Sequence, residues 1–170
     1  MERVFRLTLI ILLTPFLLLA EEIPIYVIVK GKVEKLFVKK GQKVKKEQIL
    51  LQISEELYSY ELERLKGKLR ELEIQHWKAK RDYKRYKEMF ERDLLAESIL
   101  EDKEAELKII KFRIEQIKSE IKKVETLKSY TKVKSPFSGI VKEILVGEGS
   151  FVNGELRPHK VLIIKKEYAE

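Results

Sequence analysis

The sequence contains no cysteine among its 170 residues and only two histidines. The missing thiols exclude a disulfide scaffold, a thiolate zinc site, a cysteine nucleophile and a lipid-modified N-terminal cysteine. Two histidines are too few for a histidine-rich metal centre. Glycine and proline are also scarce, at seven and four residues, which excludes a linker-rich or low-complexity chain. We therefore expect an ordered protein with no metal and no cofactor.

Sequence patterns of hydrolases and nucleotide-binding sites are absent as well. The chain has no G-x-S-x-G, no H-E-x-x-H and no P-loop pattern. Acidic residues are abundant, but they lie beside lysines along helix flanks, where solvated ion pairs explain them. We expect no catalytic residues and no enzymatic activity.

Charge is plentiful, with 36 basic and 28 acidic residues and a formal net charge of +8. Most of this charge lies on the flanks of predicted helices, so it indicates a solvated surface rather than a nucleic-acid interface. An anionic membrane surface is the other partner that such a charge would suit.

Residues 1–20 have the pattern of a targeting segment. Arg3 and Arg6 precede the uncharged, mostly apolar run Leu7–Ala20. As a helix this run would reach roughly 21 Å, short of the ~30 Å hydrocarbon core of a membrane. Ala20 suits the residue before a cleavage site, although the leucine two positions earlier is larger than signal peptidase prefers. The sequence predicts an exported protein with either a signal peptide or an uncleaved N-terminal anchor, which argues against nucleic acid as a partner.

Two segments 108 residues apart match each other in register. Both are typical of short β-strands separated by glycine turns, and Gly41 and Gly149 hold equivalent positions where a tight turn favours positive φ. One copy cannot bury a hydrophobic face alone, but two copies clasped together can. Residues 21–53 and 129–170 are therefore predicted to be two halves of one β-domain. The matched pairs are Gly31 with Gly139, Val33 with Val141, Leu36 with Ile144, Val38 with Val146, Gly41 with Gly149 and Val44 with Val152.

Residues 54–128 lie between the two halves and contain no proline. Apolar residues recur at alternating steps of four and three in two series, from Tyr58 to Phe90 and from Leu100 to Val124. Lysine and glutamate fill the flanks of both series. The pattern predicts an antiparallel coiled-coil hairpin, about 55 Å long at ~1.5 Å per residue.

The register of the hairpin follows from the two apolar series, because the numbers of facing residues sum to 189 or 190. This rule places the bend at 93–95, within a tip at 92–97. Lys103 is predicted to lie over the ring of Tyr86. Ser54, which acidic residues follow, is predicted to be the N-cap of the first helix. The facing pairs are Phe90 with Leu100, Tyr86 with Lys103, Tyr83 with Leu107, Ala79 with Ile110, His76 with Ile114 and Leu72 with Ile117.

This order of parts resembles the periplasmic adaptor, or membrane fusion protein, family of efflux pumps and type I secretion systems. The first half is similar in the stretch Gly31–Val44, and the family's V-x-A/S-P-x-x-G-x-V pattern is matched by Val133–Val141. The resemblance covers residues 23–165. It implies an α+β fold in which a lipoyl-like (biotinyl/lipoyl) β-sandwich is split by a long antiparallel coiled-coil α-hairpin.

The tip resembles the family's docking pattern, which is an arginine, a leucine four residues later and a serine eleven residues after the arginine. Alanine stands at the serine position and aspartate replaces a common glycine, so a helix-capping hydroxyl is lost, for which the aspartate is an alternative cap. The two leucines between them either contact a partner or close the coiled coil, and the arginine is either a docking residue or one more flank charge. The predicted partner-binding residues are Arg85, Met89, Asp93, Leu94, Leu95 and Ala96.

The resemblance implies a membrane-associated periplasmic protein that links an inner-membrane transporter to an outer-membrane channel through its hairpin tip. It also implies a homo-oligomeric ring, a trimer or a hexamer, whose hairpins lie side by side. Adaptors normally continue into a β-barrel and a membrane-proximal domain, whereas this sequence ends six residues after Ile164. We expect either a minimal adaptor or one whose transporter-facing part is another polypeptide. Lateral contacts between hairpins are assigned to three apolar residues outside the two series, Trp77, Ile109 and Phe112.

Two other classes of function were weighed against this one. A periplasmic coiled-coil scaffold without a transport role would have the same hairpin, but its function would not depend on Arg85 or Leu95. A lipoyl or biotinyl carrier needs a lysine at the β-turn between the two halves. Here the hairpin replaces that turn, and the sequence contains neither E-T-D-K-A nor A-M-K-M.

Overall fold

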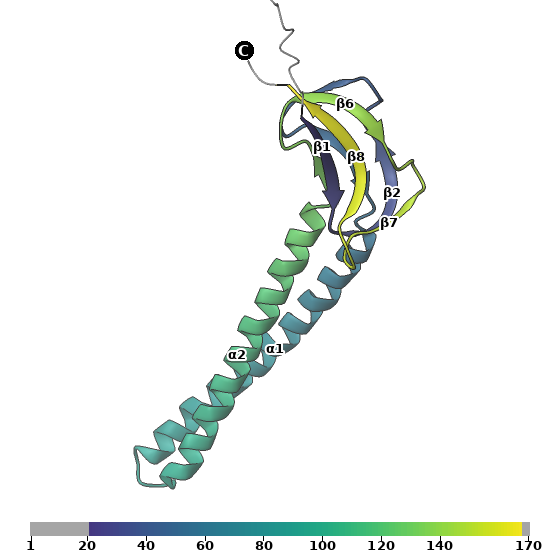
Figure 1. Cartoon of the computed structure of the whole chain (residues 1–170). Coiled ribbons are helices and arrows are strands. Elements are labelled where there is room, and N and C mark those ends of the chain that lie inside the picture. The colour runs from purple at the N-terminus through teal and green to yellow at the C-terminus, as the bar shows by residue number, and fades with distance from the viewer. Residues whose placement is uncertain (1–20, 168–170) are drawn as a thin grey trace, which may run out of the picture.

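The computed structural model describes residues 21–167, and the predicted leader, residues 1–20, lies outside them. The described strands form a sandwich from which two long antiparallel helices project (Figure 1). The predicted α+β fold, a lipoyl-like sandwich split by a helical hairpin, is confirmed. The elements are β1 (Glu22–Val27), β2 (Lys30–Leu36), β3 (Lys43–Val44), β4 (Ile49–Ile53), α1 (Glu56–Phe90), α2 (Glu97–Ser129), β5 (Lys132–Lys134), β6 (Gly139–Ile144), β7 (Phe151–Asn153) and β8 (His159–Lys166).

The two halves of the repeat build the sandwich by exchanging strands. One sheet has the order β1-β8-β6-β3 and the other β5-β4-β2-β7, so each sheet takes two strands from each half. Equivalent hydrogen bonds hold both exchanges: the Gly41 N–H donates to the Val141 carbonyl at 2.7 Å, and the Gly149 N–H donates to the Val33 carbonyl at 2.8 Å. Both glycines have the predicted positive φ, 83° and 88°. The repeat therefore produces a sandwich with approximate two-fold symmetry.

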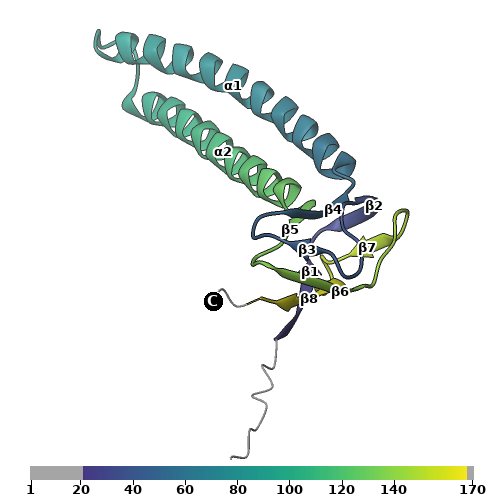
Figure 2. The same cartoon turned by 90° about the horizontal axis from the view of Figure 1, so that it is seen from above.

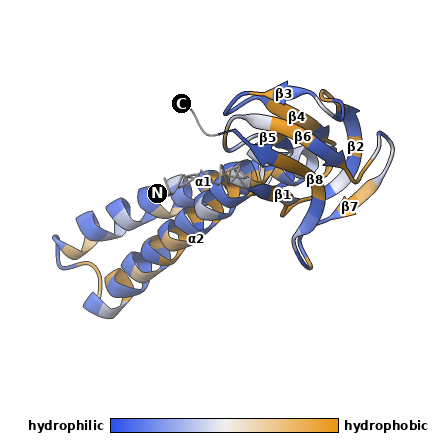
Figure 3. Cartoon of the chain, turned by 45° about the horizontal axis from the view of Figure 1, so that its top comes forward, coloured by the Kyte–Doolittle hydropathy of each residue, from blue (hydrophilic) through white to orange (hydrophobic). Residues whose placement is uncertain are grey.

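Aliphatic side chains at alternate strand positions fill the space between the sheets. This alternation is visible along the strands in Figure 3, where hydrophobic and hydrophilic segments follow one another. Both halves contribute equivalent residues, which is why neither half has a core without the other. The side chains with no exposed surface include Val33, Leu50, Leu51, Ile53, Val141, Val152, Val161, Leu162 and Ile164.

Gly154 packs against the backbone at the end of β1, where no side chain fits. A Cβ atom on Gly154 would lie 2.2 Å from the Val27 carbonyl oxygen. We therefore expect Gly154→Ala to lower the free energy of unfolding by about 1–3 kcal/mol or more. Gly67 in α1 faces open space, so Gly67→Ala is expected to raise it by about 1 kcal/mol through helix propensity. Denaturant unfolding of both variants checks this pair, and a Gly154→Ala protein as stable as the wild type would contradict the packing argument.

The two helices lie side by side along their length, as Figures 1 and 2 show. Lys103 Nζ lies 5.6 Å from the centroid of the Tyr86 ring, which confirms the predicted contact. Neither helix of the described chain has a stretch apolar enough to cross a membrane. The buried residues of the hairpin all belong to the two predicted series: Tyr58, Leu62, Leu65, Leu72 and Ala79 on α1, and Ile110 on α2.

The start of α1 differs from the prediction. Its N-cap is Glu55, without a side-chain cap hydrogen bond, so the assignment of Ser54 as the N-cap is wrong. The Ser54 N–H donates instead to the Lys32 carbonyl of β2 at 2.8 Å. Because this bond keeps the Ser54 backbone in the sandwich, the helix begins only after it.

Candidate functional site

The tip is the turn at residues 91–96, which reverses the chain between α1 and α2. The Asp93 N–H donates to the Phe90 carbonyl at 2.9 Å, and the Leu94 N–H donates to the Met89 carbonyl at 3.0 Å. This pair of bonds is typical of a helix C-terminus at which the first residue past the helix end has a left-handed backbone conformation. Asp93 holds that place with φ 56°, a conformation that favours glycine. The backbone of Asp93 thus takes the role of the glycine that it replaces.

Helix α2 begins after Ala96, its N-cap. The backbone of Ala96 is extended, with φ −68° and ψ 142°, and the cap has no side-chain hydrogen bond. Asp93 therefore does not supply the capping group that alanine lacks, and that suggestion from the sequence is wrong.

Restoring a hydroxyl at position 96 is expected to stabilise the hairpin. In Ala96→Ser the side-chain oxygen can accept the N–H of Ser98, whereas the Ile99 N–H already donates to the Ala96 carbonyl at 3.1 Å; such a cap is worth about 1 kcal/mol. The matched control is Ala105→Ser in the exposed interior of α2, expected to cost up to about 0.5 kcal/mol through helix propensity. Thermal unfolding followed by circular dichroism compares the two. A loss of stability in Ala96→Ser equal to that of the control would contradict the cap assignment.

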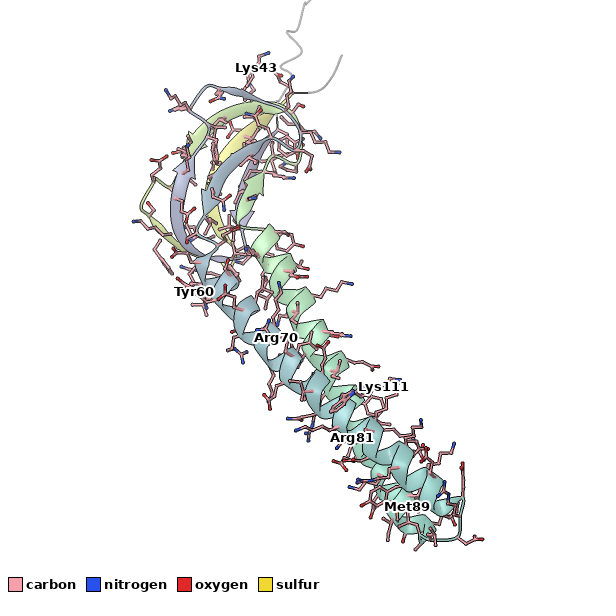
Figure 4. The ribbon with its side chains drawn as sticks, turned by 180° about the vertical axis from the view of Figure 1, so that it is seen from behind. Lys43, Tyr60, Arg70, Arg81, Met89 and Lys111 are labelled. Atoms are coloured by element: carbon pink, nitrogen blue, oxygen red, sulfur yellow. The ribbon has the colours of Figure 1, made fainter. Side chains whose placement is uncertain are left out.

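The side chains of the tip separate into exposed and partly buried groups. Leu94 is 67% exposed, whereas Leu95 is partly buried. Met89, labelled near the tip in Figure 4, is also partly buried. The Arg85 guanidinium lies 5.5 Å from the Tyr86 ring centroid and 3.5 Å from Asp82 Oδ1. Of the two leucines, Leu94 is the one available to a partner.

The outer flank of α1 carries an exposed apolar pair, Ile74 at 58% and Trp77 at 60%. Together with Arg70 and Glu73 they line a shallow groove, and the Arg81 guanidinium lies 5.2 Å from the Trp77 ring centroid. Figure 4 shows Arg70 and Arg81 along the same helix. We call Arg70, Ile74, Trp77 and Arg81 the α1 flank. Ile74 was not among the residues predicted for lateral contacts, although its spacing of three residues from Trp77 marks a second stripe on the helix.

The outer flank of α2 also carries an exposed apolar pair, Ile109 at 50% and Phe112 at 65%. Asp102, Ala105, Glu106 and Ile109 line a groove beside it. We call Asp102, Ala105, Glu106, Ile109 and Phe112 the α2 flank. Both grooves carry charges of both signs: Glu73 lies beside Arg70 in the first, and Arg113 lines the second together with Asp102 and Glu106.

The two flanks lie at the same height on the rod and face opposite ways. Trp77 is nine residues before Tyr86, and Phe112 is nine residues after Lys103, which contacts Tyr86. Ile74 and Phe112 each lie two residues from the nearest members of the apolar series, a spacing that points a helical side chain away from the partner helix. Trp77 lies three residues from Ile74, and Ile109 lies three residues from Phe112, on the same outer sides. The hairpin thus presents two different apolar surfaces on its two outer sides.

A small polar cluster joins the hairpin to the sandwich. The Tyr58 hydroxyl accepts a hydrogen bond from the Lys30 N–H at 3.0 Å and donates to Glu155 Oε1, also at 3.0 Å. Lys30 Nζ forms an ion pair with Glu155 at 2.9 Å. Burial raises the pKa of Tyr58, and the hydrogen bond from Lys30 lowers the pKa of Glu155. These contacts join α1 to β2 and to the segment after β7, so the cluster links the hairpin to its base. Residues 21–167 contain no group of histidine and carboxylate side chains that could hold a metal ion.

Comparison with known proteins identifies the architecture. Residues 21–164 match the barrel-sandwich hybrid domain of RND membrane fusion proteins (RND MFP). The structure of MacA from Actinobacillus actinomycetemcomitans superposes with a TM-score of 0.70 at 26% identity, over 86% of this chain and 50% of that one. The membrane fusion protein Spr0693 from Streptococcus pneumoniae R6 gives 0.61 at 15% identity, over 86% and 59%. The periplasmic adaptor protein EmrA gives 0.55 at 16%, over 86% and 72%.

The last two similarities concern the fold alone, because their identities are low. The chain spans half of the length of the MacA structure. Among curated proteins, the sequence search found no match.

Proposed function

Because the chain belongs to the family of membrane fusion proteins, the periplasmic adaptors of efflux systems, we propose that it is the adaptor subunit of a tripartite efflux pump or type I secretion system. Adaptors of this family are not enzymes. The observation that carries the proposal is the hairpin inserted between the halves of the matched domain. Its first helix has 35 residues, so the rod projects about 50 Å from the base at ~1.5 Å per residue.

In this proposal the hairpin tip binds an outer-membrane channel in the periplasm, and the base faces an inner-membrane transporter. The exposure of Leu94 supports a contact at the tip, since a largely exposed apolar side chain lies at the turn farthest from the base. Arg85 adds an exposed guanidinium one helical turn before Met89 on the same side of α1. An apolar contact with a neighbouring arginine is a common composition for a small docking surface.

We also propose that the hairpins of several copies pack side by side, with the α1 flank of one copy on the α2 flank of the next. Such a contact joins two different surfaces, so it leads to a ring when the rotation closes. The equal height of the flanks suits neighbours related by rotation about an axis parallel to the rods. In this arrangement Arg70 and Arg81 would face Asp102 and Glu106, and Glu73 would face Arg113, so both kinds of charge on each flank would find an opposite partner. A trimer or a hexamer would result.

The docking proposal is tested by a photo-crosslinking amino acid placed at position 94 in the full chain, expressed in its native cells. We expect a covalent adduct with an outer-membrane channel, identified by mass spectrometry. The control position is Tyr60, which is equally exposed (65%) but lies near the base, as Figure 4 shows. No adduct at position 94, or an adduct with another class of protein, would overturn the adaptor role and favour a plain scaffold.

A further inference from the structure

The end of the sandwich opposite the hairpin carries a loop rich in lysine. We call residues 39–46 the lysine loop; Figure 4 shows Lys43 at this far end. Lys43 Nζ pairs with Glu167 at 3.0 Å. Within residues 21–167 the other four lysines form no ion pair that could neutralise them. The five exposed lysines of the loop are Lys39, Lys40, Lys43, Lys45 and Lys46.

The internal repeat shows that the fold does not require these lysines. The equivalent loop of the second half, residues 147–154, repeats the same local bonds: the Lys39 N–H donates to Gln42 Oε1 at 2.9 Å, and the Gly147 N–H donates to Ser150 Oγ at 3.2 Å. None of its residues at the five positions equivalent to the lysines has a basic side chain. They are Gly147, Glu148, Phe151, Asn153 and Gly154. The clustered charge of the lysine loop therefore calls for an explanation outside the fold.

The lysine loop lies at the end of the sandwich where the described chain begins, at Glu21. In the sequence, the apolar run Leu7–Ala20 is followed by Glu21. The Glu21 carbonyl accepts a hydrogen bond from the Lys166 N–H at 3.0 Å. The ion pair of Lys43 with Glu167 ties the loop to the same end of β8. Glu21, which follows the apolar run in the sequence, and the cluster of exposed lysines thus share one end of the described molecule, while the hairpin leaves from the other.

We propose that the lysine loop binds the anionic headgroups of a phospholipid membrane and holds the base against its surface. Exposed lysines near such a surface each strengthen binding by roughly fivefold, without losing their water. The attraction decays within about 10 Å at ~0.1 M salt, so only charges at the very end of the base contribute. The hairpin would then point away from the membrane. This proposal is independent of the contacts at the tip, and an acidic protein is the competing partner.

The test compares binding of the full chain to phosphatidylcholine vesicles with and without about one-third phosphatidylglycerol. The loop variant changes the four unpaired lysines to glutamine: Lys39→Gln, Lys40→Gln, Lys45→Gln and Lys46→Gln. A control variant makes the same change at four exposed hairpin lysines: Lys66, Lys80, Lys111 and Lys118. Because residues 1–20 are identical in all three proteins, the ratio of affinities for anionic and neutral vesicles isolates the contribution of charge.

We expect the ratio to fall by about 600-fold in the loop variant, a factor of roughly five for each of its four lysines, and to stay within about threefold of wild type in the control. High salt should remove the difference between the proteins. In a variant with only Lys39→Gln and Lys40→Gln, the logarithm of the ratio should fall by about half as much. This variant provides a second measurement should the larger one fold poorly. Equal ratios for wild type and loop variant, or equal losses in both variants, would overturn the lipid assignment. Crosslinking at position 94 is expected to be unchanged in every case.

Discussion

Two variants of the hairpin, each monomeric alone, are expected to form a one-to-one dimer when they are mixed. The first carries Ile74→Glu and Trp77→Glu on the α1 flank, and the second carries Ile109→Glu and Phe112→Glu on the α2 flank. If the α1 flank of one copy binds the α2 flank of the next, each variant keeps one functional surface. The mixture can then form a single joint, and growth stops there because the remaining two surfaces are both disabled.

The substitutions are expected to have a large effect because they place unpaired charges where apolar side chains would be buried. Tryptophan is the residue most often found at energetic centres of interfaces, where its loss typically costs about 2 kcal/mol or more. A buried glutamate without a partner adds a further desolvation cost. Light scattering over a range of protein concentrations measures the mass of each variant alone and of the mixture. The control is Lys111→Glu, an exposed change on α2 outside the defined flank, which should assemble as the wild type does.

Other outcomes would each contradict a particular part of the proposal. If the second variant dimerised alone, the contact would join two α1 flanks, and a closed ring through unlike surfaces would be wrong. If both variants assembled as the wild type does, Trp77 and Phe112 would have no part in the contact between copies. A monomeric wild type would contradict lateral assembly altogether.

The hairpin could be predicted from the sequence because the periodic spacing of apolar residues along each helix determines its register. The steps of four and three in both helices determine which residues face each other, and the contact of Lys103 with Tyr86 confirms the arithmetic. The β-domain could also be predicted, because two copies of one sequence pattern identify strands that a single copy would leave ambiguous. Both signals depend on repetition along the chain.

Features that depend on one side chain or on distant contacts could not be predicted in the same way. The spacing of Leu94 and Leu95 does not tell which one is exposed, because this depends on the left-handed backbone at Asp93. The helix start was placed at Ser54 because local composition does not report its bond to Lys32 in β2. The junction cluster was missed, since Tyr58 bonds to residues 28 and 97 positions away in the sequence.

The junction between hairpin and sandwich is where we expect the second large effect, a loss of stability on substitution of Tyr58. Tyr58 is 6% exposed and packs with the core of the sandwich, so Tyr58→Ala is expected to lower the free energy of unfolding by about 3–5 kcal/mol. Tyr58→Phe keeps the ring and removes only the hydroxyl. It should cost about 1–3 kcal/mol, because the Lys30 N–H loses its acceptor and Glu155 loses a donor. Denaturant unfolding measures both, and equal stability of Tyr58→Phe and wild type would show that the hydroxyl does not hold the junction.

The difference in stability between wild type and Tyr58→Phe should depend on pH through the Tyr58 hydroxyl and the Glu155 carboxylate. Tyr58 has a raised pKa in the folded protein, so its contribution is complete below the unfolded value of about 10 and is lost as the pH rises through the folded value. Glu155 has a lowered pKa, so its contribution is complete above about 4.3 and is lost as the pH falls through the folded value. The stability of wild type minus that of Tyr58→Phe should therefore be flat from about pH 5 to 9 and shrink on either side. A difference that persists in strong alkali would contradict the hydroxyl as its source, because the ionised oxygen can no longer donate to Glu155.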